Sequence, residues 1–253
     1  MSLRYELDPA ELFRDCVGEP DPWQLKALRS DHGRQLYLCS RQSGKSAVAS
    51  IKALHTAMFN DGALVLMVSK SLPQSQELLR KALLAYRDLG KPCAVEYESR
   101  LHLELGNGSR LISLPGSEST TVGYSPTMIL LDEAAETSSD LLEALLPSVA
   151  ATRGTVIALT SAKAASGWFY ELWSRRDVSK VWETHKATAD DSSLIDESVI
   201  EEARMTRGPA YVRREFYCEF GLDHAAFFNP QDIEGSLIVP SGDVWFPERS
   251  LAS

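Results

Sequence analysis

A short segment that resembles a phosphate-binding loop constrains the fold of this chain more than any other feature. Directly after the apolar run 36–38, residues 39–46 read Cys-Ser-Arg-Gln-Ser-Gly-Lys-Ser. They fit the pattern G-x-x-x-x-G-K-[ST], except that Cys39 stands where the first glycine is usual. In that pattern backbone N–H groups close on phosphate oxygens, the lysine reaches the β- and γ-phosphates, and the last hydroxyl is offered to Mg²⁺. A helix that begins at Lys45 adds a partial positive charge that favours phosphate.

The segment therefore predicts a site for a nucleoside triphosphate, with Mg²⁺ held by the hydroxyl of Ser46. The alternative is a chance Gly-Lys-Ser turn before a helix. A strand, a loop and a helix follow one another here in the order that the motif requires, which favours the phosphate loop. The predicted nucleotide-binding residues of the loop are Ser40, Arg41, Gln42, Ser43, Gly44, Lys45 and Ser46.

Two consecutive carboxylates, Asp132 and Glu133, end the apolar run 127–131. Ligands of open α/β sheets bind at the carboxyl ends of strands, so we expect this pair beside the loop. Asp132 would support Mg²⁺, and Glu133 would orient or deprotonate the attacking water. Adjacent acids beside a polyphosphate need a cation between them, because like charges repel. The alternative is purely structural: the two acids are solvated residues between a strand end and a helix cap. The phosphate loop upstream makes this alternative less favoured.

Apolar runs alternate with helical patterns along the chain. The strands are continuously apolar, which indicates a mainly parallel α/β sheet covered on both faces. The adjacent acids indicate a P-loop NTPase of the additional-strand, catalytic-glutamate type. In that fold a further strand lies between the loop strand and the acidic strand; we prefer 155–159 for this place, with 63–68 as the alternative. The expected strands are 35–39, 63–68, 127–131 and 155–159, and the expected helices are 46–59, 72–89, 138–146, 168–175, 196–206 and 211–220.

A hairpin is expected at one edge of this sheet. Residues 102–105 and 110–114 flank Gly106-Asn107-Gly108-Ser109, a strong signal for two antiparallel strands joined by a tight turn.

Three more polar residues are candidates for nucleotide contacts. Strand 155–159 leads into Thr160 and Ser161, which would sense the γ-phosphate, although local hydrogen bonds at a strand end explain the two hydroxyls equally well. Gln24, upstream of the loop strand, would hydrogen-bond the adenine edge. A helix start with Asp21 as N-cap and Pro22 in the first turn explains the same segment, and both readings can hold together.

The overall composition limits the remaining function classes. The net charge of −9 and pI of about 5.1 argue against a surface that coats nucleic acid as a whole. The four cysteines form no C-x-x-C pair, and their low density fits a reducing compartment. No apolar stretch approaches the ~18 residues of a membrane span, so no membrane partner is expected. Two clusters of basic residues are candidates for DNA contact: Lys70/Arg80/Lys81 and Arg175/Arg176/Lys180. The ordinary alternative is that such clusters are solvated helix faces.

Taken in order, these segments resemble the ATPase domain of the large terminase subunit, the genome-packaging motor of tailed bacteriophages, over about residues 20–235. The arginine-bearing loop 40–46 is similar to that family's deviant Walker A motif, and 130–135 is similar to its Walker B motif. Residues 160–162 stand where the family has its coupling motif. The other similar segments are 69–76, 107–110, 167–173 and 213–220.

The resemblance implies Mg²⁺-dependent ATP hydrolysis that drives double-stranded viral DNA into a procapsid. It implies Arg41 as a cis arginine on the γ-phosphate, acting with Lys45 and Glu133. The family often carries another arginine that acts on the neighbouring subunit; Val122 stands at that place here, and Arg110 and Arg153 are the alternatives. The implied partners are double-stranded DNA, the portal protein, the small terminase subunit and further copies of the chain in a ring, in the cytoplasm of the bacterial host.

We expect a P-loop ATPase domain over residues 1–220, with a small lid-like helical part at about 186–220. Residues 221–253 are expected to be a C-terminal extension or linker. They lack the strand–Asp–hairpin pattern of a two-metal site, so no nuclease activity is expected. Two other functions stay open: a helicase-like ATPase that remodels nucleic acid, and a nucleotide-binding assembly module with little turnover.

Overall fold

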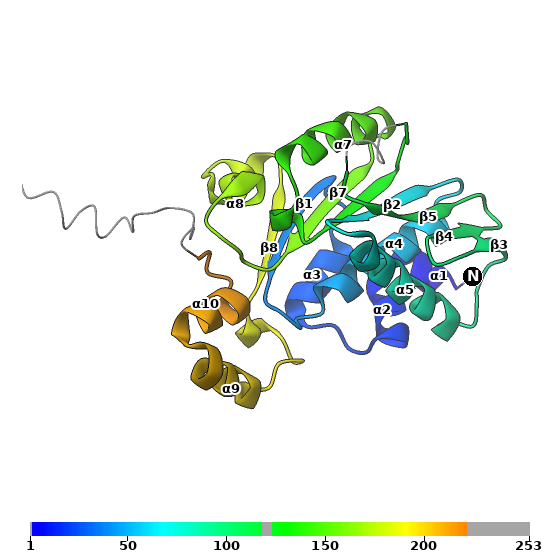
Figure 1. Cartoon of the computed structure of the whole chain (residues 1–253). Helices are drawn as coiled ribbons and strands as arrows, with labels where there is room; N and C mark the ends of the chain where they lie inside the picture. The colour runs from blue at the N-terminus through cyan, green and yellow to red at the C-terminus, as the bar shows by residue number, and fades with distance from the viewer. Residues whose placement is uncertain (1, 118–122, 222–253) are drawn as a thin grey trace, which may run out of the picture. The chain divides into compact units, whose positions relative to one another are not determined.

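A computed structural model of the chain describes residues 2–117 and 123–221. The described residues belong to one compact unit that spans Met1–Gly221 (Figure 1). The extension expected at 221–253 lies outside the described residues from position 222 onward, as does Val122.

The centre of this unit is a sheet of eight strands. Six neighbouring strands, from β5 to β8 in the order below, run parallel, and the pairs β3–β4 and β4–β5 are antiparallel. The order across the sheet is β3 (Val95–Glu98), β4 (His102–Leu105), β5 (Arg110–Pro115), β2 (Leu64–Ser69), β6 (Met128–Asp132), β7 (Thr155–Thr160), β1 (Arg34–Cys39) and β8 (Glu183–Ala187).

The position of β7 confirms the prediction of an additional strand. It pairs with β1 on one side and with β6 on the other, so it separates the strand before the phosphate loop from the strand that ends in the carboxylates. The edge hairpin is also confirmed: β4 and β5 are antiparallel, and Gly108 in their connection has a φ of 78°, a conformation that glycine adopts without strain.

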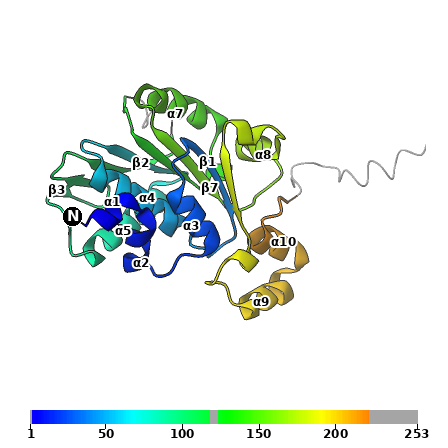
Figure 2. The same ribbon diagram turned by 180° about the vertical axis from the view of Figure 1, so that it is seen from behind.

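Helices cover both faces of the sheet, which explains the continuously apolar strands. Alternate residues of β1 show the division: Tyr37 and Cys39 pack into one core with α2, α3, α4 and α5, whereas Leu36 and Leu38 pack into another with α7 and α8. Figures 1 and 2 show the two helical layers from opposite sides. The helices are α1 (Leu3–Leu7), α2 (Pro9–Cys16), α3 (Pro22–Arg29), α4 (Lys45–Phe59), α5 (Leu72–Asp88), α7 (Ser139–Thr152) and α8 (Gly167–Ser174).

Two further helices form a small helical pair after β8. α9 (Glu197–Arg207) begins at Asp196, whose carboxylate accepts a hydrogen bond from the Ser198 N–H at 2.8 Å. Gly208, with a φ of 83°, ends α9, and Pro209 starts α10 (Pro209–Tyr217). The pair has its own small core of Ala189, Ile200, Val212 and Phe216. This pair lies within the lid-like part expected at 186–220.

Three short 3₁₀ helices complete the described elements: η1 (Ala134–Glu136), η2 (Val178–Lys180) and η3 (Ala189–Asp191). The sequence analysis did not predict α1, α2, β3 or β8, and it ended α7 too early. α7 continues through Pro147 to Thr152. Within the described ranges, no helix combines the length and apolarity that a membrane crossing requires.

Candidate nucleotide site

The predicted phosphate loop connects β1 to the N-terminus of α4, at the carboxyl edge of the sheet. Gly44 is the N-cap of α4 and has a φ of 83°. A Cβ at this position would lie 2.5 Å from the Gln24 Nε2 atom, so both the backbone conformation and the space require glycine. Lys45 is the first residue of the helix, where free N–H groups and the helix dipole attract anions.

Hydrogen bonds hold the loop from two sides. The Gln24 amide of α3 donates to the Ser43 carbonyl at 3.0 Å, and the Ser43 hydroxyl donates to the Ser40 carbonyl at 2.8 Å. On the other side, the Ser40 N–H donates to the Ala187 carbonyl of β8 at 2.7 Å, and the Arg41 N–H donates to the Glu215 carbonyl of α10 at 2.9 Å. The loop is therefore pre-shaped by elements before and after it in the chain.

Cys39, which replaces the usual first glycine, needs no special backbone conformation. It is the last residue of β1, it is fully buried, and it is absent from the residues with positive φ. Burial raises the pKa of the Cys39 thiol. The thiol therefore stays protonated and packs as a small apolar group in the core between the sheet and α3–α5.

Three predicted residues meet at the phosphate end of the site. Lys45 Nζ donates to Ser161 Oγ at 3.1 Å and lies 3.8 Å from Glu133 Oε1. Glu133 has a φ of 50° and a ψ of 44°, a left-handed conformation that costs a non-glycine residue about 1–2 kcal/mol. Such strain, in a residue that follows a buried strand, is typical of functional sites.

Asp132 lies at the end of β6 and is 9% exposed. Its Oδ1 accepts a hydrogen bond from the Glu133 N–H at 3.0 Å. Burial, and secondly the charge of Glu133, raise the pKa of Asp132 to about 6. Burial, and secondly the neighbouring charge, thus disfavour the ionised form of Asp132, and a bound cation would favour it.

Buried polar atoms beside this pair also lack a partner. Glu133 Oε2 and the hydroxyl of Ser69, which stands next to Asp132 across β2 and β6, have no hydrogen-bond partner among the described residues. Buried polar atoms in proteins are nearly always paired, so these two atoms are candidates for contact with a bound polar group. Ser46 is half-buried in the first turn of α4, directly after Lys45, and its role as a metal ligand stays a prediction.

Thr160 and Gln24 make the local hydrogen bonds that the sequence analysis gave as the alternatives to nucleotide contacts. The Thr160 hydroxyl is buried, donates to the Ser161 carbonyl at 3.0 Å and accepts from the Ala135 N–H at 3.4 Å. It thereby links β7 to η1, directly after Glu133. Gln24 is 3% exposed, and its Oε1 accepts from the Asp21 N–H at 2.9 Å. Both ends of the Gln24 amide are engaged with backbone, and its adenine contact stays a prediction.

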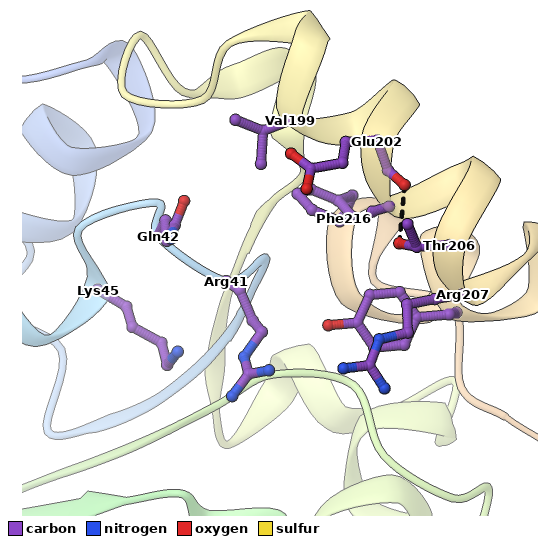
Figure 3. Close-up of a pocket in the computed structure, with 10 residues that line it drawn as sticks. Arg41, Gln42, Lys45, Val199, Glu202, Thr206, Arg207 and Phe216 are labelled. Carbon is purple, nitrogen blue, oxygen red and sulfur yellow. Dashed lines mark hydrogen bonds between the residues drawn. The ribbon is translucent and has the colours of Figure 1, made fainter.

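A cavity of about 520 Å³ lies between the loop and the helical pair α9–α10 (Figure 3). Arg41 points into it from the loop, and Arg207 from the end of α9. The Tyr211 hydroxyl, and after it the charge of Glu215, raise the pKa of Arg41 above its usual value, and Arg41 Nε lies 3.5 Å from Glu215 Oε2. The α9–α10 side of the cavity, which the sequence analysis missed, consists of Val199, Glu202, Ala203, Thr206, Arg207, Tyr211 and Phe216.

The other candidate basic residues lie elsewhere. Arg110 begins β5, and Arg153 is the C-cap of α7, two positions before the start of β7, so both lie at the amino edge of the sheet, opposite the loop. Neither can act on the phosphate site of its own chain. Lys70 pairs with Glu136, Arg80 with Glu77, and Arg175 with Asp177, at N–O distances of 3.2, 2.6 and 3.2 Å.

Comparisons with known proteins identify the family and the fold. Residues 36–234 match the family described as terminase large subunit, T4likevirus-type, N-terminal. The fold is similar to the large terminase ATPase domain of Thermus phage P74-26, with a TM-score of 0.70 and 20% identity over 85% of this chain and 100% of that one. No curated protein sequence matches the chain.

Two longer proteins have a similar fold over part of their length. The large terminase of the thermophilic bacteriophage D6E gives a TM-score of 0.68 with 16% identity, over 79% of this chain and 53% of that one. The large terminase of bacteriophage HK97 gives 0.67 with 15% identity, over 86% and 55%. The chain therefore corresponds to about half of each of these two proteins. Because the family match covers most of its length, the chain belongs to the N-terminal domain family of T4-like large terminase subunits.

Proposed function

We propose that this chain is a Mg²⁺-dependent ATPase whose turnover drives double-stranded viral DNA into a procapsid. The observation that carries the proposal is the meeting of Lys45, Glu133 and Ser161 at the carboxyl edge of one sheet. The similar large terminase of phage D6E has been solved in complex with ADP and with ATP-γ-S, which supports a nucleotide as the ligand.

Each residue has a distinct task in this proposal. The loop N–H groups and Lys45 bind the β- and γ-phosphates. Lys45 then turns from Glu133, whose Oε1 it faces at 3.8 Å, toward the phosphates. Glu133 is left free to orient the attacking water and to accept its proton, while the bond between the γ-phosphorus and the bridging oxygen breaks and ADP leaves. Arg41 and Ser161 stabilise charge on the transferred phosphoryl group.

Asp132 and Ser46 are the residues that would hold Mg²⁺. The raised pKa of Asp132 and the unpartnered Glu133 Oε2 fit a cation at this place. When bound, Mg²⁺ neutralises charge on the β- and γ-phosphate oxygens.

The decisive experiment is Glu133→Gln. The amide keeps the size of the side chain but cannot accept the proton of water, so ATP-γ-S affinity should stay within about threefold while turnover falls by at least ~10²-fold. Isothermal titration and a phosphate-release assay measure the two effects. Glu143→Gln, at an exposed position of α7, is the control and should change neither. Turnover of Glu133→Gln at the parent rate would remove Glu133 from the chemistry.

The motor function has its own test, because translocation needs several copies and DNA. We propose a homo-oligomeric ring that docks on the procapsid through the portal protein and receives DNA with the small terminase subunit, in the host cytoplasm. Phosphate release per chain should then rise with protein concentration and with added double-stranded DNA. Nucleotide binding without release at any concentration would favour the assembly module, and DNA unwinding without packaging would favour the helicase-like alternative.

A further inference from the structure

A network of three charged side chains spans the carboxyl end of β6, next to the acidic pair. At its centre is Glu136, the last residue of η1. Its Oε2 accepts a hydrogen bond from Lys70 Nζ at 3.2 Å, and its Oε1 lies 2.8 Å from Lys163 Nζ. Lys70 directly follows β2, and Lys163 comes shortly after β7. Because β2 and β7 are the two neighbours of β6 in the sheet, Glu136 bridges the strands on either side of the acidic strand.

The main chain joins this network to the candidate site. The Glu136 N–H donates to the Glu133 carbonyl at 2.8 Å, which closes the single turn of η1. Lys163 comes two positions after Ser161, whose hydroxyl accepts the hydrogen bond from Lys45. A displacement of Glu136 would therefore reach Glu133 through one turn of backbone.

The conformation of Glu133 makes such support necessary. Its φ is 50°, and a residue other than glycine keeps this conformation only where the surrounding structure holds it. The Ala135 N–H donates to the Thr160 hydroxyl, but at a long 3.4 Å. The other two residues of η1 are alanines, so Glu136 is the one side chain of this turn that can form ion pairs.

The shared carboxylate is more than an isolated surface ion pair. Single exposed pairs contribute little to stability, whereas a network of several charges can hold a segment in place. The side chains of Glu136 and Lys163 are 29% and 32% exposed, and that of Lys70 is 60% exposed. Lys163 is the main reason why the pKa of Glu136 lies below its usual value, so the carboxylate is ionised at neutral pH.

We propose that Glu136 is a positioning residue, whose ion pairs with Lys70 and Lys163 hold the turn that fixes Glu133 for catalysis. Glu136 acts only through Glu133 and has no contact of its own with the nucleotide or the metal. This inference rests on the proposed ATPase function, and it adds a residue that sets the rate of the chemical step without setting nucleotide affinity.

The separation of rate from affinity is the first test. Glu136→Ala removes both ion pairs, and kcat should fall about tenfold or more, because a misplaced catalytic group can cost up to ~10²-fold. ATP-γ-S affinity should stay within about threefold. Glu136→Gln still accepts a hydrogen bond from one lysine, so its kcat should lie between those of the parent and Glu136→Ala. Glu77→Ala is the control, because it removes an ion pair with Arg80 on α5, 2.6 Å long, and should change neither quantity.

A double-mutant cycle tests whether Glu136 acts through Glu133. In the Glu133→Gln background, Glu136→Ala should cause no further loss of the single-turnover rate. Lys163→Met, which removes one partner and leaves Glu136 in place, should cause a smaller loss of kcat, again only when Glu133 is present, and it carries the test if Glu136→Ala does not fold. An unchanged kcat in both variants, an equal loss of ATP-γ-S affinity, or additive losses without Glu133 would each overturn the positioning role while the ATPase proposal stands. A parent chain without turnover would overturn both.

Discussion

Gly44 shows how one residue fixes the geometry of the phosphate loop. Its φ is 83°, and a Cβ would overlap the Gln24 amide that supports the loop. Gly44→Ala should therefore displace Gln24 and distort the loop. A distortion that costs about 1.4 kcal/mol of binding free energy weakens ATP-γ-S binding about tenfold, and we expect at least this loss. Isothermal titration measures the loss.

The matched control separates backbone strain from overlap. Gly62 has a φ of 68°, but a Cβ there would meet nothing within 4 Å. Gly62→Ala should lower the melting temperature and leave nucleotide affinity unchanged. If both variants lose affinity equally, the contact between Gln24 and the loop has no special role.

Asp132 should make metal binding pH-dependent. Burial and Glu133 raise the pKa of Asp132 to about 6, so between about pH 4 and 6 the folded protein binds more protons here than the unfolded chain. The contribution of Asp132 to stability therefore falls as the pH rises through that window. Mg²⁺ needs the ionised carboxylate, so its apparent affinity should fall about tenfold per pH unit below pH 6.

Titration of Mg²⁺ into the protein with ATP-γ-S at pH 5, 6 and 7 measures this dependence. The phosphates of the nucleotide also titrate near these pH values. Asp132→Asn is therefore the reference, because it removes the carboxylate and leaves the titration of the nucleotide unchanged. Parallel pH profiles of the parent and Asp132→Asn would exclude Asp132 as the titrating metal ligand.

At the scale of elements, a buried lysine fastens α3 to α4. Lys52 is 6% exposed and its Nζ donates to the Ala27 and Ser30 carbonyls at 2.7 and 2.6 Å, at the C-terminus of α3. Because α3 carries Gln24, this contact also supports the loop. Lys52→Met should cost about 1–3 kcal/mol at pH 7, because it leaves buried carbonyls unpaired. Denaturant unfolding measures the cost.

The pH dependence of that cost follows from the pKa of Lys52, which burial lowers to about 8. Between about pH 8 and 10.4 Lys52 binds more protons in the unfolded chain than in the folded protein. The contribution of Lys52 to the free energy of unfolding therefore rises with pH in this window, and it is lost as the pH falls through 8. The stability difference between the parent and Lys52→Met should therefore widen in this window. Lys26→Met, at an exposed position of α3, should show no such change.

The sequence predicted the elements that local patterns encode. The continuous apolar runs and the Gly106–Ser109 turn gave the strands, their burial and the hairpin. α1 is short and has no buried residue, and the single strand β3 is mostly exposed, so neither has the apolar pattern on which the prediction depends. α2 is only about two turns long and buries one side, with Leu12 and Phe13, so its apolar pattern is too short to predict a helix.

At the scale of the whole molecule, the site residues divide in the same way. Lys45, Asp132 and Glu133 follow from one rule, that the carboxyl ends of parallel strands meet at one edge. The partners of Arg41 do not follow from any local pattern, because Tyr211 and Glu215 reach the loop only through the packing of α10. No local pattern predicts the left-handed conformation of Glu133 either, because glycine and not glutamate is the usual residue there.

The segment after α10 ties the helical pair to the sheet. The thiol of Cys218 is 3.2 Å from the Ala187 carbonyl, and the Phe220 ring packs against Tyr170 at 4.9 Å between centroids. The Gly221 N–H donates to the Lys163 carbonyl at 2.8 Å. These contacts attach α10, and with it Glu215, to β8 and to the segment after β7. They should therefore contribute to both folding and nucleotide binding.

Two truncations test this attachment. A chain that ends at Gly221 keeps every described contact of the site, and it should retain the melting temperature and ATP-γ-S affinity of the parent. A chain that ends at Tyr217 loses these contacts; a loss of about 2–3 kcal/mol would lower the melting temperature by roughly 4–12 °C. Its ATP-γ-S affinity should fall as well, because α10 no longer holds the Arg41 backbone. Equal melting temperatures of the two truncated chains would show that α10 is anchored by its own core alone.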